Sequence, residues 1–283
     1  MALKAHRVSR SMAGNIALFT FLALLSAFMV LPLVFVVANA FKPLNELFIF
    51  PPRFYVINPT LNNFRNLFQI MNGSWMPFSR YVFNSVTVTL FGTVGHIILA
   101  SLCAYSLSKI PFPGAKVVFR IIVLSLMFSP VVTTVPNYII MAKIGLVDTL
   151  PAVILPALQS SLGLYLMKQF LDTLPDSMIE AARIDGASEF KLFFRIVMPM
   201  LKPAWLTLGI LSIQGLWNIV SPYTYSEELK TLPQALSQIV AGGISRTGVG
   251  SAVALLMIIV PIVCFVVSQS NIIQTMSTSG MKD

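Results

Sequence analysis

Six long apolar runs constrain this chain more than any other feature of its sequence. Each run has about 20 or more residues with almost no charge, the length that a helix needs to cross a hydrocarbon core of about 30 Å. The runs are continuous rather than alternating, which favours helices over β-barrel strands. We therefore predict an all-α integral membrane protein with six transmembrane helices, at approximately 16–40, 81–108, 117–141, 151–171, 204–225 and 248–269.

Composition supports a membrane location and argues against a nucleic-acid-binding protein. Of 283 residues, 56% are hydrophobic and 10% are charged, whereas a soluble domain carries about 25% charged residues. The net charge of +9 comes from basic residues that lie between the apolar runs, where they set membrane orientation. The two cysteines, Cys103 and Cys264, lie inside apolar runs and are expected to be buried small hydrophobes rather than a disulfide.

Basic residues also predict the orientation of the chain. With the N-terminus inside the cell, twelve of the nineteen Lys and Arg residues fall on the inner side, which favours an N-in, C-in topology. The first apolar run is longer than the 7–15 residues of a signal-peptide core, so an uncleaved first helix is expected. The predicted organisation is a cytoplasmic N-terminus (1–15), a transmembrane permease domain (16–271) and a cytoplasmic tail (272–283).

Two further segments carry local signals. The predicted external loop 42–80 contains a stretch, 61–71, with helical apolar spacing, which fits either a helix on the outer membrane surface or a packed loop helix. The predicted third span contains Pro130 and Pro136. These prolines should break the helical hydrogen-bond ladder and bend the span.

Charge returns in the middle of the chain, at 176–203. Ser177 and Glu180 have capping-box spacing at the start of a short helix. Gly186 is expected to end that helix, and Ser188 to cap a second one. The small residues of the first helix would allow close approach of a partner protein. An interfacial linker that lies on the lipid is the alternative reading of the same residues.

The same segment resembles a known family. Glu180-Ala181-Ala182, Asp185-Gly186-Ala187 and Pro199 are spaced as in the EAA loop of ATP-binding-cassette (ABC) importer permeases. Asn84-Ser85, Leu216-Trp217-Asn218 and the stretch 231–236 extend the resemblance over essentially the whole chain. It indicates a MalG-like permease of the carbohydrate-uptake-1 type with a MetI/MalG-like type I importer fold. The residues implied in ATPase coupling, within a cytoplasmic loop at 176–199, are Ser177, Glu180, Ala181, Ala182, Arg183, Asp185, Gly186, Ala187 and Pro199.

The resemblance implies the partners and the activity. The chain would be the transmembrane subunit of an ATP-driven importer in a bacterial or archaeal cytoplasmic membrane. A MalF-like second permease, an ATPase homodimer and an extracytoplasmic solute-binding protein would complete the complex. The substrate would be a carbohydrate, most simply an oligosaccharide; seven basic against four acidic outer residues are compatible with an acidic one. The tail, 269–282, departs from the Gly-rich ending common in relatives.

No catalytic chemistry is expected in this chain. It lacks a Walker-type phosphate-binding run, so ATP and Mg²⁺ are expected on the partner ATPase, with no cofactor or metal here. His96, one of two histidines, falls inside a span and is expected to be neutral and bonded to a neighbouring helix. The candidate substrate-path residues, which could equally make interhelical hydrogen bonds and core packing, are Tyr138, Gln159, Ser160, Gln214, Trp217 and Asn218.

Alternative functions remain open from the sequence. An importer permease for a non-sugar solute would share the EAA-like loop. A secondary transporter would need an ion-coupling carboxylate inside a span, whereas all ten acidic residues fall in loops or at span ends.

Overall fold

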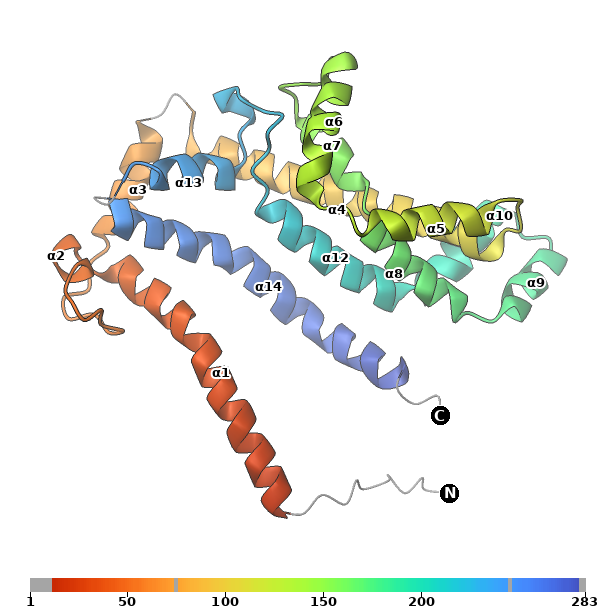
Figure 1. Ribbon diagram of the computed structural model, residues 1–283, viewed down its shortest axis with the longest axis horizontal. Helices are drawn as coiled ribbons and strands as arrows, with labels where there is room; N and C mark the ends of the chain where they lie inside the picture. Colours follow the sequence, from red (N-terminus) through yellow and green to blue (C-terminus); the bar gives the residue numbers. More distant parts are fainter. Residues whose placement is uncertain (1–11, 74–75, 244–245, 280–283) are drawn as a thin grey trace. The chain divides into compact units, whose positions relative to one another are not determined.

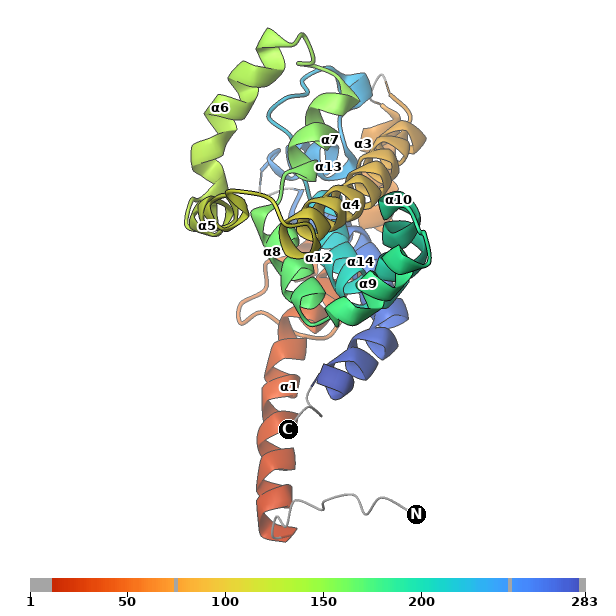
Figure 2. The ribbon, with the colours of Figure 1, turned by 90° about the vertical axis from the view of Figure 1, so that its right-hand side faces the viewer.

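The computed structural model describes residues 12–73, 76–243 and 246–279 as a helical chain (Figures 1 and 2). No strand occurs in these ranges. The chain forms two compact units, Met1–Leu67 with Gly242–Leu255, and Phe68–Ala241 with Leu256–Asp283. The helices are α1 (Met12–Phe41), α2 (Leu44–Leu47), α3 (Asn62–Asn72), α4 (Phe78–Lys109), α5 (Ala115–Ser125), α6 (Pro130–Lys143), α7 (Leu150–Leu158), α8 (Ser161–Asp172), α9 (Asp176–Ile184), α10 (Glu189–Leu192), a π-helical turn (Phe193–Val197), α11 (Met198–Met200), α12 (Lys202–Trp217), a 3₁₀ turn (Glu227–Leu229), α13 (Leu232–Val240) and α14 (Thr247–Ser279).

Three of the described helices are long and apolar enough to cross a membrane: α1, α4 and the Thr247–Gln269 part of α14. Two bent pairs meet the same criteria as broken spans, which raises the number to five. The pair α7 and α8 is bent by 41°, and the pair Glu189–Met200 and α12 by 78°. The all-helical membrane class is therefore confirmed, whereas the six-span count and the N-in, C-in orientation stay predictions.

The predicted third span, 117–141, is not a single helix. Helix α5 ends at Ser125 and α6 begins at Pro130. Ser129 is extended, and its hydroxyl accepts a hydrogen bond from the Val131 amide at 3.4 Å. A serine cap followed by proline at the first helical position starts a new helix, while Pro136 stays inside α6. One of the two prolines thus marks the expected break.

The fourth and fifth predicted spans, 151–171 and 204–225, are also not continuous helices over their whole length. Helix α7 ends at Leu158, and Ser160 caps the start of α8 by accepting a hydrogen bond from the Gly163 amide at 3.2 Å. Helix α12 ends at Trp217 rather than near 225. Pro222 follows soon after and disfavours helical conformation in the residue before it, so the chain continues as an irregular loop.

Helix α4 is the central helix of the second unit, where it packs along α12, α8 and α7 (Figure 1). Ala100 and Ala104 are buried on it, and their small side chains allow close helix packing. The core around them includes Met167 and Leu171 of α8 and Leu208 of α12, and it extends to the segment after α8 through Ile179 and Phe193. Helix α4 and the loop at 176–199, which the sequence predicts to be cytoplasmic, therefore share one hydrophobic core.

In the first unit, the end of α1 is held by polar contacts. The Asn63 side-chain amide donates to the carbonyls of Ala40 and Lys42 at 2.9 and 2.8 Å. The Lys42 ammonium donates to Asn39 at 2.9 Å and to the Arg53 carbonyl. Because Asn63 and Leu67 of α3 are buried, the stretch predicted at 61–71 is a packed loop helix.

The two predicted terminal segments lie largely at the edge of the described chain. Helix α1 begins at Met12, and residues 1–11 lie outside the described residues. Helix α14 continues to Ser279, so most of the tail predicted at 272–283 is helical, while 280–283 lie outside the described residues.

Candidate functional site

The segment predicted to couple to an ATPase contains α9, a helix of nine residues. It begins at Asp176 after Pro175, which is extended and makes no side-chain cap. The predicted capping box of Ser177 and Glu180 is therefore wrong, because Ser177 already lies within the first turn. The start is fixed instead by Lys109 of α4, which donates to the Leu174 carbonyl and to the Asp176 carboxylate, both at 2.7 Å.

The stop signal at the other end of α9 is confirmed. Gly186 has a φ of +77°, a left-handed conformation that glycine adopts without steric cost. The Gly186 amide donates to the Arg183 carbonyl and the Ala187 amide to the Ala182 carbonyl, both at 3.0 Å. This pair of bonds is a Schellman motif. Ser188 then caps α10 by accepting from the Lys191 amide at 3.4 Å, as predicted.

Helix α9 has one face packed on the chain and one face exposed. Ile179 and Ala182 are 4% and 7% exposed and belong to the core around α4. Ala182 therefore packs within the core of the chain, and its role in ATPase coupling stays a prediction. On the other face Ile184 is 86% exposed, and Ser177, Met178, Glu180, Ala181, Asp185 and Gly186 are also exposed. An exposed isoleucine on a charged short helix is typical of a docking surface.

Arg183 and Glu189 connect α9 to α10 and to α4. Arg183 Nε donates to Glu189 Oε1 at 2.8 Å, and the Tyr105 hydroxyl of α4 donates to Glu189 Oε2 at 2.6 Å. The hydrogen bond from Arg183 and then that from Tyr105 hold the pKa of Glu189 below its ordinary value. Arg183 is thus engaged within the chain, and Glu189, which sequence reasoning missed, links the short helices to the long central helix.

The other predicted loop residues have distinct positions. Ala187 is partly buried and packs against the core that holds Ile179. Pro199 lies in α11 and is exposed. It is separated from α9 in the sequence by α10 and the π-helical turn.

The six predicted substrate-path residues do not form one cluster. Gln159 and Ser160 lie at the break between α7 and α8, in the wall of a pocket of about 530 Å³. Trp217 is buried, and its indole donates to the Met257 carbonyl of α14 at 3.1 Å. Asn218 is exposed and donates to the Gln214 carbonyl at 2.9 Å. Tyr138 is 44% exposed on α6. Trp217 therefore connects helices, as the structural alternative expects.

His96 of α4 is buried where α4 packs against α12. Its Nδ1 lies 2.7 Å from the Ser212 hydroxyl of α12. The predicted bond to a neighbouring helix is confirmed. Within the described residues, no group of His, Cys, Asp and Glu side chains is arranged to hold a metal ion.

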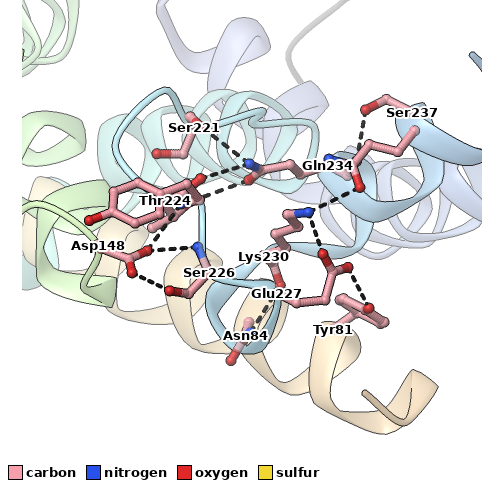
Figure 3. A network of polar contacts seen from close by, with 12 residues as sticks. Tyr81, Asn84, Asp148, Ser221, Thr224, Ser226, Glu227, Lys230, Gln234 and Ser237 are labelled. Carbon is pink, nitrogen blue, oxygen red and sulfur yellow. Dashed lines mark hydrogen bonds and ion pairs between the residues drawn. The ribbon is translucent and has the colours of Figure 1, made fainter. Parts of the chain in front are cut away.

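A polar network holds the loop after α12 against α4 and α13 (Figure 3). Asn84 donates to the carbonyls of Glu228 and Lys230 at 2.8 and 2.9 Å. The Leu232 amide donates to the Ser85 hydroxyl at 2.7 Å. Gln234 donates to the Thr224 carbonyl at 3.0 Å. The Asn84-Ser85 pair and the stretch 231–236, on which part of the resemblance rests, thus build one loop scaffold.

Asp148 anchors the same loop to the turn between α6 and α7. Its carboxylate accepts hydrogen bonds from the Tyr225 and Ser226 amides at 3.0 and 2.9 Å, and from the Ser226 hydroxyl. Burial raises the pKa of Asp148, but these hydrogen bonds outweigh it and hold the pKa below the ordinary value. Asp148 has a φ of +62°, a conformation that Asp tolerates better than most residues. The sequence carried no specific signal for this role.

The comparison with known proteins identifies the family. The sequence profile of the "Binding-protein-dependent transport system inner membrane component" matches residues 96–278. The chain belongs to this family. It is therefore a multi-pass membrane component of an ABC transport system. The matched region includes His96, α9 and the stretch 231–236 of the loop scaffold, but not Asn84 and Ser85.

Relatives and solved structures agree with this assignment. The chain is 29% identical to the "Arabinooligosaccharides transport system permease protein AraQ" of Bacillus subtilis (strain 168), over 95% of this chain and 96% of that protein. A bacterial ABC transporter "involved in the import of the acidic polysaccharide alginate" has a similar fold, with a TM-score of 0.77, 22% identity and coverage of 92% and 98%. A second structure, of a bacterial alginate ABC transporter with an "alginate pentasaccharide-bound periplasmic protein", gives a TM-score of 0.59, 17% identity and coverage of 93% and 96%.

Proposed function

We propose that this permease is one of two transmembrane subunits of an importer that takes up an oligosaccharide delivered by an extracytoplasmic binding protein. The observation that carries the proposal is α9, a capped helix with an exposed apolar residue and its opposite face buried in the core of α4. A partner that displaces α9 can also displace α4, because Ile179 packs in the core around α4 and Glu189 is hydrogen-bonded to Tyr105 of α4.

The partner that binds the exposed face of α9 is an ATPase homodimer, which itself binds ATP and Mg²⁺. Its contact surface on this chain, the coupling surface, consists of Met178, Glu180, Ala181, Ile184 and Asp185. When ATP closes the ATPase dimer, α9 moves with it and shifts α4 toward an outward-facing arrangement. Hydrolysis then resets the complex. This assignment places 176–199 and both termini in the cytoplasm of a cell whose cytoplasmic membrane holds the complex.

The opposite end of the second unit presents the loop scaffold, which we assign to the binding protein. Tyr225 is 69% exposed there and Val220 56%, while Asp148 and Asn84 hold the loop in place. A rigid loop with exposed apolar side chains can bind a partner with little loss of conformational entropy. The carbohydrate class is supported by the named substrates of the relatives, and a MalF-like permease would complete the path.

The assembled complex tests this function. The chain would be purified with its partner permease and ATPase, and ATP hydrolysis measured as glycan-loaded binding proteins are added. A loaded binding protein should stimulate hydrolysis, while an unloaded one should stimulate less. If the ATPase does not copurify with the chain, or if loaded binding proteins leave hydrolysis unchanged, the proposal is wrong.

The coupling surface is tested by charge reversal. Glu180→Lys should reduce retention of the ATPase, because Glu180 is exposed on α9. The matched control is Glu228→Lys, which changes an exposed acid in the loop scaffold and should leave ATPase retention as in the wild type. Equal retention by both variants would contradict the assignment of α9.

A further inference from the structure

The first half of α5 carries two cationic side chains that no acidic side chain neutralises. Lys116 and Arg120 are both exposed, and their spacing of four residues places them one turn apart on the same face of the helix. Within the part of the chain that the structure describes, neither side chain makes a hydrogen bond or an ion pair. We call these two residues the α5 cation pair.

Neighbouring lysines at the same end of the second unit are neutralised within the chain. The Lys109 ammonium lies 2.7 Å from the Asp176 carboxylate. The Lys168 ammonium lies 2.7 Å from the Asp172 carboxylate and 4.5 Å from the centre of the Phe119 ring. Contacts within the protein therefore account for the charges of these two lysines, whereas the α5 cation pair is left for an anion from outside the chain.

The α5 cation pair lies where the chain turns back at the end of a membrane-spanning helix. Helix α4 is long and apolar enough to cross a membrane, and it ends at Lys109. Helix α5 begins at Ala115, directly after Gly114 with a φ of +91°, and packs against α8 and α4 (Figure 2). Since the ends of spanning helices lie near the lipid headgroups, and long basic side chains extend toward that layer, the pair can reach headgroup phosphates.

Exposed apolar side chains lie directly beside the α5 cation pair. Val117 and Ile121, which each follow one of the two cations, are 58% and 61% exposed. The opposite side of α5 is covered, because Phe119 stacks on Tyr165 of α8 with ring centroids 6.2 Å apart and an interplanar angle of 6°. A ligand with an anionic head and a hydrocarbon tail would cover both kinds of side chain. A soluble anion would leave the apolar ones in water.

An acidic surface of the ATPase is the other candidate partner for these cations. Lys116 lines a pocket of about 830 Å³ between the α4–α5 turn and α9, and Glu180 of the coupling surface lies in the same wall. Arg120 is not among the described residues that line this pocket. A ligand that contacts both cations therefore lies along α5, outside the pocket next to α9, which favours lipid over the ATPase.

We propose that the α5 cation pair binds the phosphate of an anionic phospholipid, whose acyl chains lie along Val117 and Ile121. Basic residues at the ends of spanning helices attract anionic headgroups, and these two have no competing acid in the described chain. The proposal goes beyond the proposed function, because it names a lipid ligand and does not depend on which solute is transported.

The test measures binding of a fluorescent phosphatidylglycerol to the complete complex in a nonionic detergent. Lys116→Gln and Arg120→Gln should each raise the Kd about fivefold, the effect of removing one cation near a headgroup. Lys116→Arg, which keeps the charge, should bind as the wild type does. The matched control is Lys143→Gln, which removes an exposed cation at the end of α6 and should leave the Kd unchanged. Unchanged Kd values in both α5 variants, or an equal rise in the control, would overturn the proposal.

Competition identifies the source of the anion. Unlabelled phosphatidylglycerol should displace the probe, whereas phosphatidylcholine with the same acyl chains should displace it only weakly, because its headgroup carries no net charge. Inorganic phosphate at the same concentration should not displace the probe. Equal displacement by phosphatidylcholine, or displacement by inorganic phosphate, would contradict a site for an anionic lipid.

Retention of the ATPase separates lipid binding from docking of the partner. Both glutamine variants should retain the ATPase as the wild type does, while their Kd for phosphatidylglycerol rises. If they lose the ATPase and bind the lipid with the wild-type Kd, the α5 cation pair belongs to the ATPase interface and the lipid proposal is wrong. A complex that binds the lipid as expected but imports no glycan would instead refute the carbohydrate function alone.

Discussion

Replacement of Tyr105 by Phe is the sharpest test of how α9 is attached to α4. The substitution removes only the hydroxyl that donates to Glu189 at 2.6 Å and keeps the ring that packs against Phe193 with centroids 5.5 Å apart. A hydrogen bond to a charged group contributes about 1.5–3 kcal/mol. The Glu189 side chain is 51% exposed, so water competes and the lower value of about 1.5 kcal/mol applies. That loss corresponds to a roughly tenfold change in a local opening equilibrium.

Hydrogen exchange followed by mass spectrometry measures this opening directly. Amides of 183–192 should exchange about tenfold faster in Tyr105→Phe, while those of α12 keep the wild-type rate. Tyr165→Phe serves as the control, because Tyr165 lies on α8 and stacks on Phe119 instead. If exchange in 183–192 is the same in wild type and Tyr105→Phe, or rises equally in the control, the link through Glu189 does not hold α9 in place.

Three further predictions concern Gly186, Gly163 and the carboxylates. Gly186→Val should distort the end of α9 and lower glycan transported per ATP, because a β-branched residue at a φ of +77° costs about 1–2 kcal/mol. The control in the same transport assay is Gly145→Val, the same change at a φ of +71° outside α9. Gly163→Ala should lower the thermal unfolding midpoint of the purified complex, since its Cβ would lie 2.2 Å from His96; Gly215→Ala, where a Cβ meets nothing within 4 Å, should not. The pKa of Glu189 lies below its ordinary 4.5 and that of Asp148 below its ordinary 3.8. Each ionised carboxylate therefore stabilises the folded state above its ordinary pKa, and this stabilisation is lost as the pH falls through the lowered pKa. The thermal unfolding midpoint should fall between pH 7 and pH 3, and it should fall less steeply in Glu189→Gln.

Sequence patterns predicted the positions of the helices well but not where the helices break. Apolar runs located α1, α4 and α14, because a bilayer requires about 20 apolar residues in a helix. The interruptions at Ser129 and Ser160 arise from serine hydroxyls that accept amide hydrogen bonds in the middle of a run. A single serine in an apolar run is also common inside a continuous helix, so its capping role is visible only in three dimensions.

Local sequence signals predicted the end of α9 correctly, whereas its start depends on contacts with residues distant in the sequence. Its end follows from a local requirement, the left-handed conformation at Gly186, and was predictable. Its start was misassigned to Ser177, because the contact that fixes it comes from Lys109, distant in the sequence. The burial of Ala182 likewise depends on the core around α4. Local rules therefore located the helix, while tertiary packing decided which face remains for a partner.

The loop scaffold could be predicted only as a set of family-like residues. Asn84 and Ser85 bond residues more than 140 positions away, a pairing that no spacing rule reveals. Asp148 left no sequence signal beyond its place in a short loop.

ATP-dependent uptake by the reconstituted complex tests the central claim most directly. The chain, its partner permease and the ATPase would be placed in liposomes with ATP inside, and the binding protein loaded with a labelled oligosaccharide outside. The account predicts glycan accumulation that requires ATP and falls sharply in Glu180→Lys. Accumulation that proceeds without ATP, or that is unaffected by Glu180→Lys, would contradict the claim that this chain is a carbohydrate importer subunit driven through α9.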